Sequence, residues 1–375
     1  MRIVLGLLCL CFLIFFHELG HFLAAKLFKV KVEAFSVGFG PVLLHRKHGD
    51  TDYRLSLIPL GGYCKMKGEN DFFRSLELDL DYIDAEKDSL YGVHSLKRIA
   101  ISFAGPFFNF LYAFMGFVII ALAGYTYYSY SNKINLATDT YPEMHSAAKD
   151  AGILSGDVIT SINGTPINNF CDLIMEVGSR PDEKIKVQVL RDNEELTFTV
   201  QTEMDKKSGT GKIGVAAIPD TMAKYEATRY SFFPALFQGL KECVKAVKIQ
   251  FKGIISLFKG ADISKSVSGP ARIADMVGSV LTESFSENLR SGIVNLFSFT
   301  SMISISLFIM NLLPVPVLDG GMILFSLIEL TTCKKLKPKL LSRVQYVGIA
   351  LILILFFIGL SGDIQYFMNI FRGTK

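Results

Sequence analysis

The feature that most limits what this chain can fold into is a set of long stretches without a charged residue. Residues 99–132, 291–318 and 344–362 contain no Asp, Glu, Lys or Arg, and residues 3–17 form a shorter stretch of the same kind. A helix needs about 20 apolar residues to cross the hydrocarbon core of a bilayer. Charged residues make up 20% of the chain, whereas roughly a quarter is usual in soluble proteins. We therefore exclude a purely soluble fold and a disordered chain, and expect a polytopic membrane protein.

The bulk composition also limits the partners. The net charge is +4 and the basic residues are scattered, so nothing indicates binding to nucleic acid. The six cysteines form no C-x-x-C pair, and several lie in or beside apolar stretches, where a thiol behaves as a small hydrophobic group. We therefore predict neither disulfide bonds nor a cysteine-bound metal.

The first apolar stretch continues beyond a polar interruption. Residues 3–16 have the length of a signal-peptide core. No small-x-small cleavage pattern follows, however, and apolar residues resume between Leu19 and Phe28. Residues 1–28 therefore predict one transmembrane helix with a polar insertion at His17-Glu18. Such an insertion is costly in lipid and indicates a functional site.

The rest of the chain divides by changes in pattern and charge. In residues 30–68 the residue pattern alternates as in a strand and is interrupted by glycines, which indicates β-hairpins. Residues 133–220 are charged and rich in turn residues, which indicates a small β-rich domain. The predicted order is a first transmembrane helix (1–28), a β region (29–68), an acidic cytoplasmic loop (69–98), a second transmembrane helix (99–128), a β-rich domain (129–222), an amphipathic helix (229–260), a third transmembrane helix with the segment after it (291–331) and a fourth transmembrane helix (340–361).

Basic residues near the ends of the spans indicate the orientation. Lysines and arginines occur at both ends of residues 29–98 and cluster at 334–339, whereas Lys133 alone lies near the start of the β-rich domain. Short loops rich in Lys and Arg tend to stay in the cytoplasm. We therefore expect residues 29–98 and 332–342 in the cytoplasm and the β-rich domain outside, with Arg372 and Lys375 counting weakly against this orientation.

The sequence His17-Glu18-Leu19-Gly20-His21 matches H-E-x-x-H inside an apolar helix. The i, i+4 spacing places both imidazoles on one helix face, where they can bind Zn²⁺, and puts Glu18 beside the metal to take a proton from bound water. The alternative is a chance match with two hydrogen-bonded histidines. Because each ionisable group at membrane depth needs a partner, we favour zinc.

A catalytic zinc usually has three protein ligands and one open position. The metzincin continuation is absent, because Ala24 and Leu27 occupy the positions of its glycine and third histidine. Asp319 ends the uncharged stretch 291–318 and precedes two glycines, which makes it the candidate third ligand. Its alternative role is that of an interfacial helix terminator.

Several further motifs accompany these residues. They are Gly105-Pro106-x-x-Asn109, Asn311-x-x-Pro314 followed by Leu318-Asp319-Gly320, and the segments 35–41 and 57–63. Together with His17–His21 they resemble the site-2 protease family of intramembrane zinc metalloproteases, in particular its bacterial RseP type. The resemblance implies one Zn²⁺ per chain, with His17, His21 and Asp319 as ligands and Glu18 as the residue that activates water.

The resemblance also implies how a substrate is held. Residues 33–68 would bind an unwound substrate as an added strand, a mode in which main-chain hydrogen bonds supply affinity. The implied substrate-binding residues are Gly61, Gly62, Asn109, Asn311 and Pro314. The alternative role of the two asparagines is to join membrane helices by hydrogen bonds, and we favour it less.

Residues 146–164 resemble a bacterial PDZ domain. The resemblance implies that the turn Ala151-Gly152-Ile153-Leu154 corresponds to the loop that binds a peptide carboxylate. The alternative is a PDZ fold that only excludes bulky substrates. The RseP of enteric bacteria has two PDZ domains, whereas this chain has room for one.

The expected protein is therefore an α-helical polytopic membrane protein with four transmembrane helices, a membrane-associated β-hairpin region and one β-rich PDZ domain. The resemblance implies a protease of the bacterial inner membrane, with its active site near the cytoplasmic face and its PDZ domain in the periplasm. Its implied substrates are single-pass membrane proteins already shortened outside, such as anti-sigma factors, or remnant signal peptides. The alternatives are a non-enzymatic PDZ scaffold and a metal-ion permease. Glu18 argues against both, because zinc binding alone does not require it.

Overall fold

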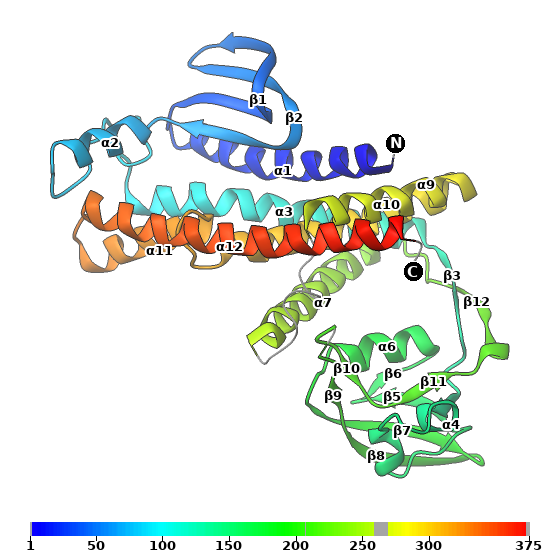
Figure 1. Ribbon diagram of the computed structural model, residues 1–375. Helices are drawn as coiled ribbons and strands as arrows, with labels where there is room; N and C mark the ends of the chain where they lie inside the picture. The colour runs from blue at the N-terminus through cyan, green and yellow to red at the C-terminus, as the bar shows by residue number, and fades with distance from the viewer. Residues whose placement is uncertain (1, 207, 259–268, 373–375) are drawn as a thin grey trace. The chain divides into compact units, whose positions relative to one another are not determined.

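The chain forms two compact units in a computed structural model that describes residues 2–206, 208–258 and 269–372 (Figure 1). The first unit comprises Met1–Ala123, Ser231–Val247 and Ser268–Lys375, and the second comprises Gly124–Tyr230 and Lys248–Val267. Among the described residues, four helices are long and apolar enough to cross a membrane: α1 (Arg2–Leu27), α3 (Ser95–Ala123), α10 (Leu289–Leu312) and α12 (Pro338–Phe371). This confirms the prediction of a membrane protein with four such helices.

Small residues allow the helices of the first unit to pack closely. α3 packs against α1, α10 and α11 (Asp319–Thr332), and α1 also packs against α9 (Pro270–Glu287). A Cβ added to Gly20 of α1 would lie 2.3 Å from the carbonyl oxygen of Ala104 in α3. Since lipid supplies no hydrophobic force between helices, such backbone approach is what holds membrane helices together.

The β region of the first unit is a curled sheet made by only two long strands. β1 (Val32–His48) and β2 (Thr51–Met66) pair antiparallel. Residues 34–37 of β1 pair on one side with residues 52–55 of β2 and on the other side with residues 62–65. The end of β2 therefore forms an edge strand, and no described strand pairs with its other edge.

The second unit is rich in β structure. β5 (Val158–Ile162), β6 (Thr165–Pro166), β7 (Lys184–Arg191) and β8 (Glu194–Gln201) form a four-stranded sheet in the order β6-β5-β7-β8. The shorter strands are β3 (Thr126–Ser129), β4 (Ile134–Leu136), β9 (Glu203–Met204), β10 (Gly211–Lys212), β11 (Val215–Ala217) and β12 (Ala223–Glu226). The helices are α4 (Ala137–Thr140), α5 (Ala147–Asp150), α6 (Phe170–Gly178) and the 3₁₀ helix η1 (Pro219–Thr221). One apolar core, including Ile153, Ile159 and Val187, joins the sheet to α5 and α6.

Several boundaries differ from the predicted ones. α3 ends at Ala123 rather than residue 128, because Gly124 has a φ of 59° and stops the helix. The predicted acidic loop contains a helix, α2 (Glu69–Glu77), and α9 was not predicted. α7 (Phe232–Phe258) corresponds to the predicted amphipathic helix, whose residues 259–260 lie outside the described residues.

Candidate metal centre

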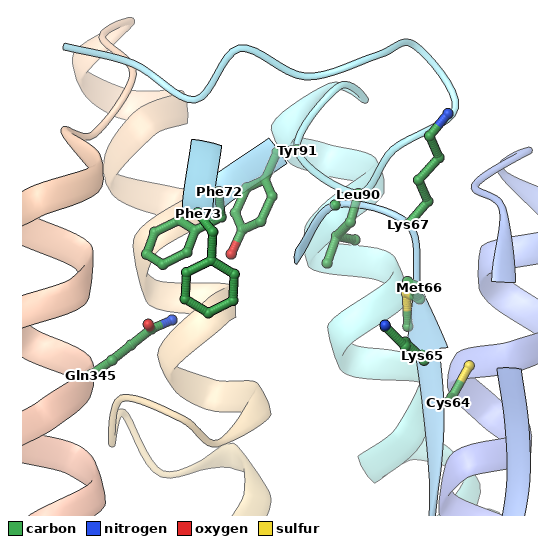
Figure 2. A pocket seen from close by; sticks show the side chains of 10 residues that line it. Cys64, Lys65, Met66, Lys67, Phe72, Phe73, Leu90, Tyr91 and Gln345 are labelled. Atoms are coloured by element: carbon green, nitrogen blue, oxygen red, sulfur yellow. The ribbon is translucent and has the colours of Figure 1, made fainter. Parts of the chain in front are cut away.

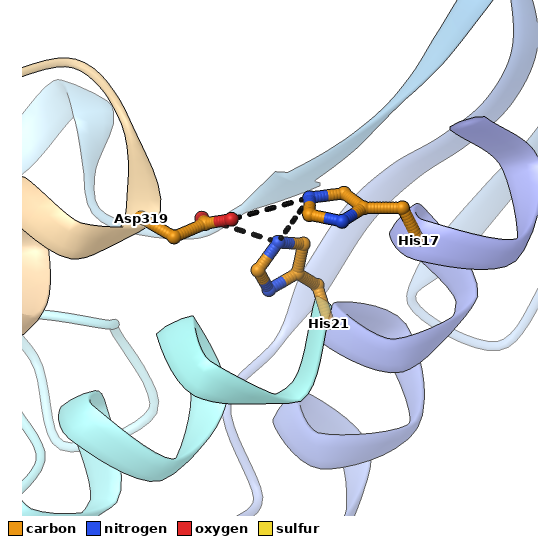
Figure 3. A group of neighbouring side chains, drawn as sticks. All are labelled: His17, His21 and Asp319. Atoms are coloured by element: carbon orange, nitrogen blue, oxygen red, sulfur yellow. Dashed lines mark hydrogen bonds and ion pairs between the residues drawn. The ribbon is translucent and has the colours of Figure 1, made fainter. Parts of the chain in front are cut away.

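Three buried or half-buried side chains meet where α1 faces the start of α11. His17 and His21 are adjacent on one face of α1 and are 7% and 6% exposed, and Asp319 is the first residue of α11. Nε2 of His17 lies 3.2 Å from Oδ2 of Asp319, and Nε2 of His21 lies 3.2 Å from Oδ1 of the same carboxylate (Figure 3). The structure therefore brings together the three predicted ligands, although they are separated by about 300 residues of chain.

The spacing of these atoms fits a zinc ion. The two Nε2 atoms are 3.2 Å apart, and the ligand atoms of the three residues all lie within 4.8 Å of one another. Tetrahedral zinc with bonds of about 2.0–2.1 Å holds its ligand atoms roughly 3.3 Å apart. The Nε2–Nε2 distance also fits an N–H···N hydrogen bond, but the carboxylate of Asp319 beside both nitrogens completes a set of three ligand atoms of the kind that a zinc ion binds.

Each imidazole is also held through its other nitrogen. Nδ1 of His21 lies 2.8 Å from the carbonyl oxygen of Ile101, and Nδ1 of His17 lies 3.0 Å from Nδ2 of Asn109. Asn109 is fully buried, and its Oδ1 has no hydrogen-bond partner. The amide oxygen and nitrogen exchange places by a half-turn about the Cβ–Cγ bond. With Oδ1 toward His17, the amide accepts the Nδ1 proton and leaves the lone pair of Nε2 for a metal.

Gly105 of α3 leaves the space that the imidazoles occupy. A Cβ at this position would lie 2.2 Å from Nε2 of His21 and 2.8 Å from Cε1 of His17. No side chain larger than hydrogen fits there while the histidines keep their positions. The motif Gly105-Pro106-x-x-Asn109 therefore contributes to the centre in two ways. Gly105 leaves space for the two imidazoles, and the side-chain amide of Asn109 contacts His17.

Glu18 lies in a cavity of about 320 Å³ that the two histidines and Asp319 also line. Cys64 of β2 lines the same cavity. A Cβ on Gly62 would lie 3.8 Å from Cγ of Glu18. The edge strand of β2 therefore passes directly beside Glu18.

Only some of the other predicted substrate-binding residues lie at the cavity of the metal centre. Asn311 lines the cavity of the metal centre, and Gly62 lies beside Glu18. Gly61 faces Phe39 instead, since a Cβ added to this glycine would lie 2.6 Å from Cε2 of that ring. Pro314 is exposed and is not part of the cavity wall, and Asn109 faces His17.

Sequence reasoning missed two features of the centre. The carbonyl of Ile101 is a backbone group and leaves no side-chain signal in a sequence. Val317, which lines the cavity, has a φ of 87°, an unfavourable value for a β-branched residue. Its strain lies two residues before Asp319, where the chain turns from an irregular segment into α11.

The turn predicted to bind a peptide carboxylate has no free N–H group. The N–H groups of Ala151, Gly152 and Ile153 donate to the carbonyls of Ala147, Lys149 and Ala148. The N–H of Leu154 donates to Oδ2 of Asp157 at 2.9 Å. In this structure all four donors of the turn therefore already have partners within the second unit.

An H-E-x-x-H helix, a distant aspartate and membrane-length helices define a class of protein, the membrane metalloproteases. The model of Peptidase family M50 matches residues 5–355. The chain belongs to this family, the site-2 proteases, and is a zinc metalloprotease.

Relatives from several bacteria agree with this assignment. Three of them carry the name "Putative zinc metalloprotease". The protein from Treponema pallidum is 31% identical over 98% of this chain and 100% of its own length. Those from Campylobacter jejuni and Clostridium acetobutylicum are 35% and 30% identical, over 96% and 98% of this chain and 92% and 98% of their own lengths. The resemblance to the site-2 protease family is thus confirmed, and the protein is an enzyme rather than a scaffold or a permease.

Proposed function

We propose that this zinc metalloprotease hydrolyses a peptide bond in or near the transmembrane segment of single-pass membrane proteins. The observation that carries the proposal is the edge strand of β2, which runs beside Glu18 and the three candidate ligands. A peptide bond inside a helix has its carbonyl engaged and must be unwound before it can be attacked. An edge strand supplies hydrogen bonds to an unwound substrate.

In this proposal His17, His21 and Asp319 hold one zinc ion per chain. When bound, zinc supplies a Lewis acid that polarises the scissile carbonyl and acidifies a water molecule. The carboxylate of Glu18 takes the proton of that water and delivers it to the leaving nitrogen. Glu18 lies beside Gly62 of the edge strand, and Asn311 is placed to contact the substrate in the same cavity.

The surroundings in this proposal are the bilayer of the bacterial inner (cytoplasmic) membrane. Large apolar side chains are exposed on β1 and β2, namely those of Val42, Leu43, Leu44, Leu55 and Leu57. An exposed apolar surface of this kind is typical of a membrane contact. We place the metal centre near the cytoplasmic face, because His17 and His21 lie near the end of α1 that precedes the basic segment from Lys26 to Lys31.

For the second unit we propose a PDZ domain outside the cytoplasm that restricts which substrates reach the protease. The filled N–H groups of its 151–154 turn support a size filter rather than capture of a C-terminus. Substrates would then be membrane proteins already shortened outside, such as anti-sigma factors, or remnant signal peptides.

Replacement of Glu18 tests the proposed reaction. Glu18→Gln should keep bound zinc and lose cleavage of a single-pass model substrate. Glu283→Gln, an exposed residue of α9, is the matched control and should cleave normally. Asp319→Ala should lose both zinc and cleavage. Cleavage by the Glu18→Gln protein would overturn the mechanism, and full zinc content in Asp319→Ala would overturn the assignment of the third ligand.

Thiol labelling tests the orientation. A cysteine introduced at Asn193, in the turn between β7 and β8, should react from outside in a protein whose exposed Cys171 and Cys333 have been replaced by serine. Reaction only from the cytoplasmic side would invert the proposed topology.

A further inference from the structure

A second cavity adjoins the cavity of the metal centre. It has a volume of about 400 Å³, and three of its lining residues, Cys64, Met66 and Leu90, also line the metal-centre cavity. Figure 2 shows Phe72, Phe73 and Tyr91 grouped together across a gap from Leu90 and Met66. The two cavities therefore follow one another along the end of β2.

The open edge of β2 stops where this second cavity begins. Beyond Met66, the backbone N–H of Leu90 donates to the carbonyl oxygen of Lys67 at 2.8 Å. The N–H of Lys31 donates to the carbonyl oxygen of Asp88 at 2.9 Å, so residues 88–90 connect the start of β1 to the end of β2. The edge that a substrate strand could follow from Gly62 onward ends with β2 at Met66, beside the second cavity.

The cavity wall favours a large apolar group. Phe72 is buried against the ring of Tyr91, with 6.1 Å between the ring centroids, whereas Phe73 is 52% exposed. The nearby cations have partners: Nζ of Lys67 lies 2.7 Å from both Asp88 and Glu86. With these charges balanced, aromatic surface dominates what the cavity offers.

We propose that this cavity, which we term the aromatic subsite, binds a large apolar side chain of the substrate about four residues from the scissile bond. The inference rests on the proposed function and deepens it. An extended strand rises about 3.3 Å per residue, so four residues from Gly62 beside Glu18 to Met66 cover about 13 Å. Specificity then depends on a residue remote from the cut bond, as well as on its immediate neighbours.

Cleavage of a substrate series tests the aromatic subsite. In one single-pass substrate, Phe or Ala is placed in turn at each of six positions on either side of the cut. For each position, the Phe and the Ala version of the substrate compete for cleavage by the full-length zinc protein. We expect Phe to be preferred about tenfold over Ala at one position three to five residues from the cut, a discrimination normal for an apolar pocket. Absence of any preference beyond the two residues nearest the cut would overturn the inference.

Two variants connect that preference to the cavity. Phe73→Ala should reduce the preference at that position alone, and Gln345→Phe should shift it toward Ala by filling the space. Phe357→Ala, an exposed phenylalanine of α12 that lines neither cavity, is the control and should leave the preference unchanged. An equal change in the cleavage of all substrates would mean that Phe73 and Gln345 act only on the fold, and the inference would be wrong.

Crosslinking supplies a readout that needs no cleavage. In the Glu18→Gln protein, a substrate with p-benzoylphenylalanine at the preferred position should crosslink to the Phe72–Phe73 peptide. Crosslinks from that position only to peptides outside the cavity would also overturn the inference. Absence of cleavage of every membrane substrate by the wild-type zinc protein would instead refute the proposed function, so the two failures are distinguishable.

Discussion

The side-chain amide of Asn109 lies 3.0 Å from Nδ1 of His17 and is completely buried. Ser304 of α10 donates a hydrogen bond of 2.8 Å to the carbonyl oxygen of Asn109, which fixes the backbone at this point. Asn109 therefore orients a candidate ligand and has no exposed surface for a substrate. The sequence motif identified Asn109 as a residue of the site, and in the structure its side chain contacts the candidate ligand His17.

Replacement of Asn109 should change zinc affinity. Asn109→Leu removes the acceptor for the Nδ1 proton of His17, and loss of such a partner typically weakens metal binding by about 10–100-fold. Asn109→Asp keeps an acceptor and should retain zinc more tightly than the leucine variant. Competition with a chelator measures both. Asn295→Leu, which removes a hydrogen bond to Ser284 away from the centre, should bind zinc like the wild type. Equal affinities of the leucine and aspartate variants would contradict the positioning role.

A methyl group at Gly105 should prevent assembly of the metal centre. The added Cβ of Gly105→Ala would come within 2.2 Å of Nε2 of His21, so the imidazole cannot keep the position in which it contacts Asp319. We expect purified protein with little bound zinc, measured by elemental analysis. Gly253→Ala in α7 is the matched control, because a Cβ there meets no atom within 4 Å. A full complement of zinc in Gly105→Ala would show that α3 packs more loosely on α1 than these distances require.

Arg98 of α3 and Glu329 of α11 form a buried ion pair. Loss of either partner should strongly destabilise the folded protein. Both side chains are only 9% exposed, and Oε1 of Glu329 also accepts the N–H of Leu336 at 2.9 Å. Removing one member of a buried pair leaves an uncompensated charge and costs roughly 3–5 kcal/mol. Arg98→Met and Glu329→Leu should each unfold at lower temperature in detergent. The double variant should recover much of the loss, and an additive loss would argue against direct coupling.

Acid should loosen the segment around Asp88, which connects the start of β1 to the end of β2. Hydrogen bonds from Lys67 and Lys31 lower the pKa of Asp88 to about 2, from an ordinary value near 3.8. Because the folded-state pKa is depressed, this carboxylate stabilises the fold above pH 4, and the stabilisation is lost as the pH falls toward 2. Asp88→Asn should produce the same loosening at pH 7. Hydrogen exchange of residues 86–92 measures it, and unchanged protection in the variant would refute the role of Asp88.

The chemistry of the centre could be predicted because it depends on residue types that are rare at membrane depth. His17, Glu18, His21 and Asp319 were each identified from their cost in an apolar stretch, and the structure brings the three predicted ligands together. The backbone contacts could not be predicted. The carbonyl of Ile101 and the bond from Leu90 to Lys67 involve groups that every residue carries.

The parts of the fold that could be predicted are those that follow from hydropathy. The four membrane-length helices follow from uncharged stretches, but α9 contains acidic residues and is broken up by polar ones, so no apolar stretch marks it. The order of strands in the β region was also beyond sequence patterns. β1 pairs with two separate parts of β2, and only this double pairing turns residues 62–66 into an edge beside Glu18.

The distance along the chain between His21 and Asp319 has a consequence for how the protein is made. The ribosome adds about 5–20 residues per second, so the aspartate emerges at least about 15 s after the histidines. During that interval α1 is already in the bilayer while α11 does not yet exist. A newborn chain therefore lacks the complete set of candidate ligands until its final third has been inserted. The metal centre can therefore be completed only after most of the chain has been synthesised.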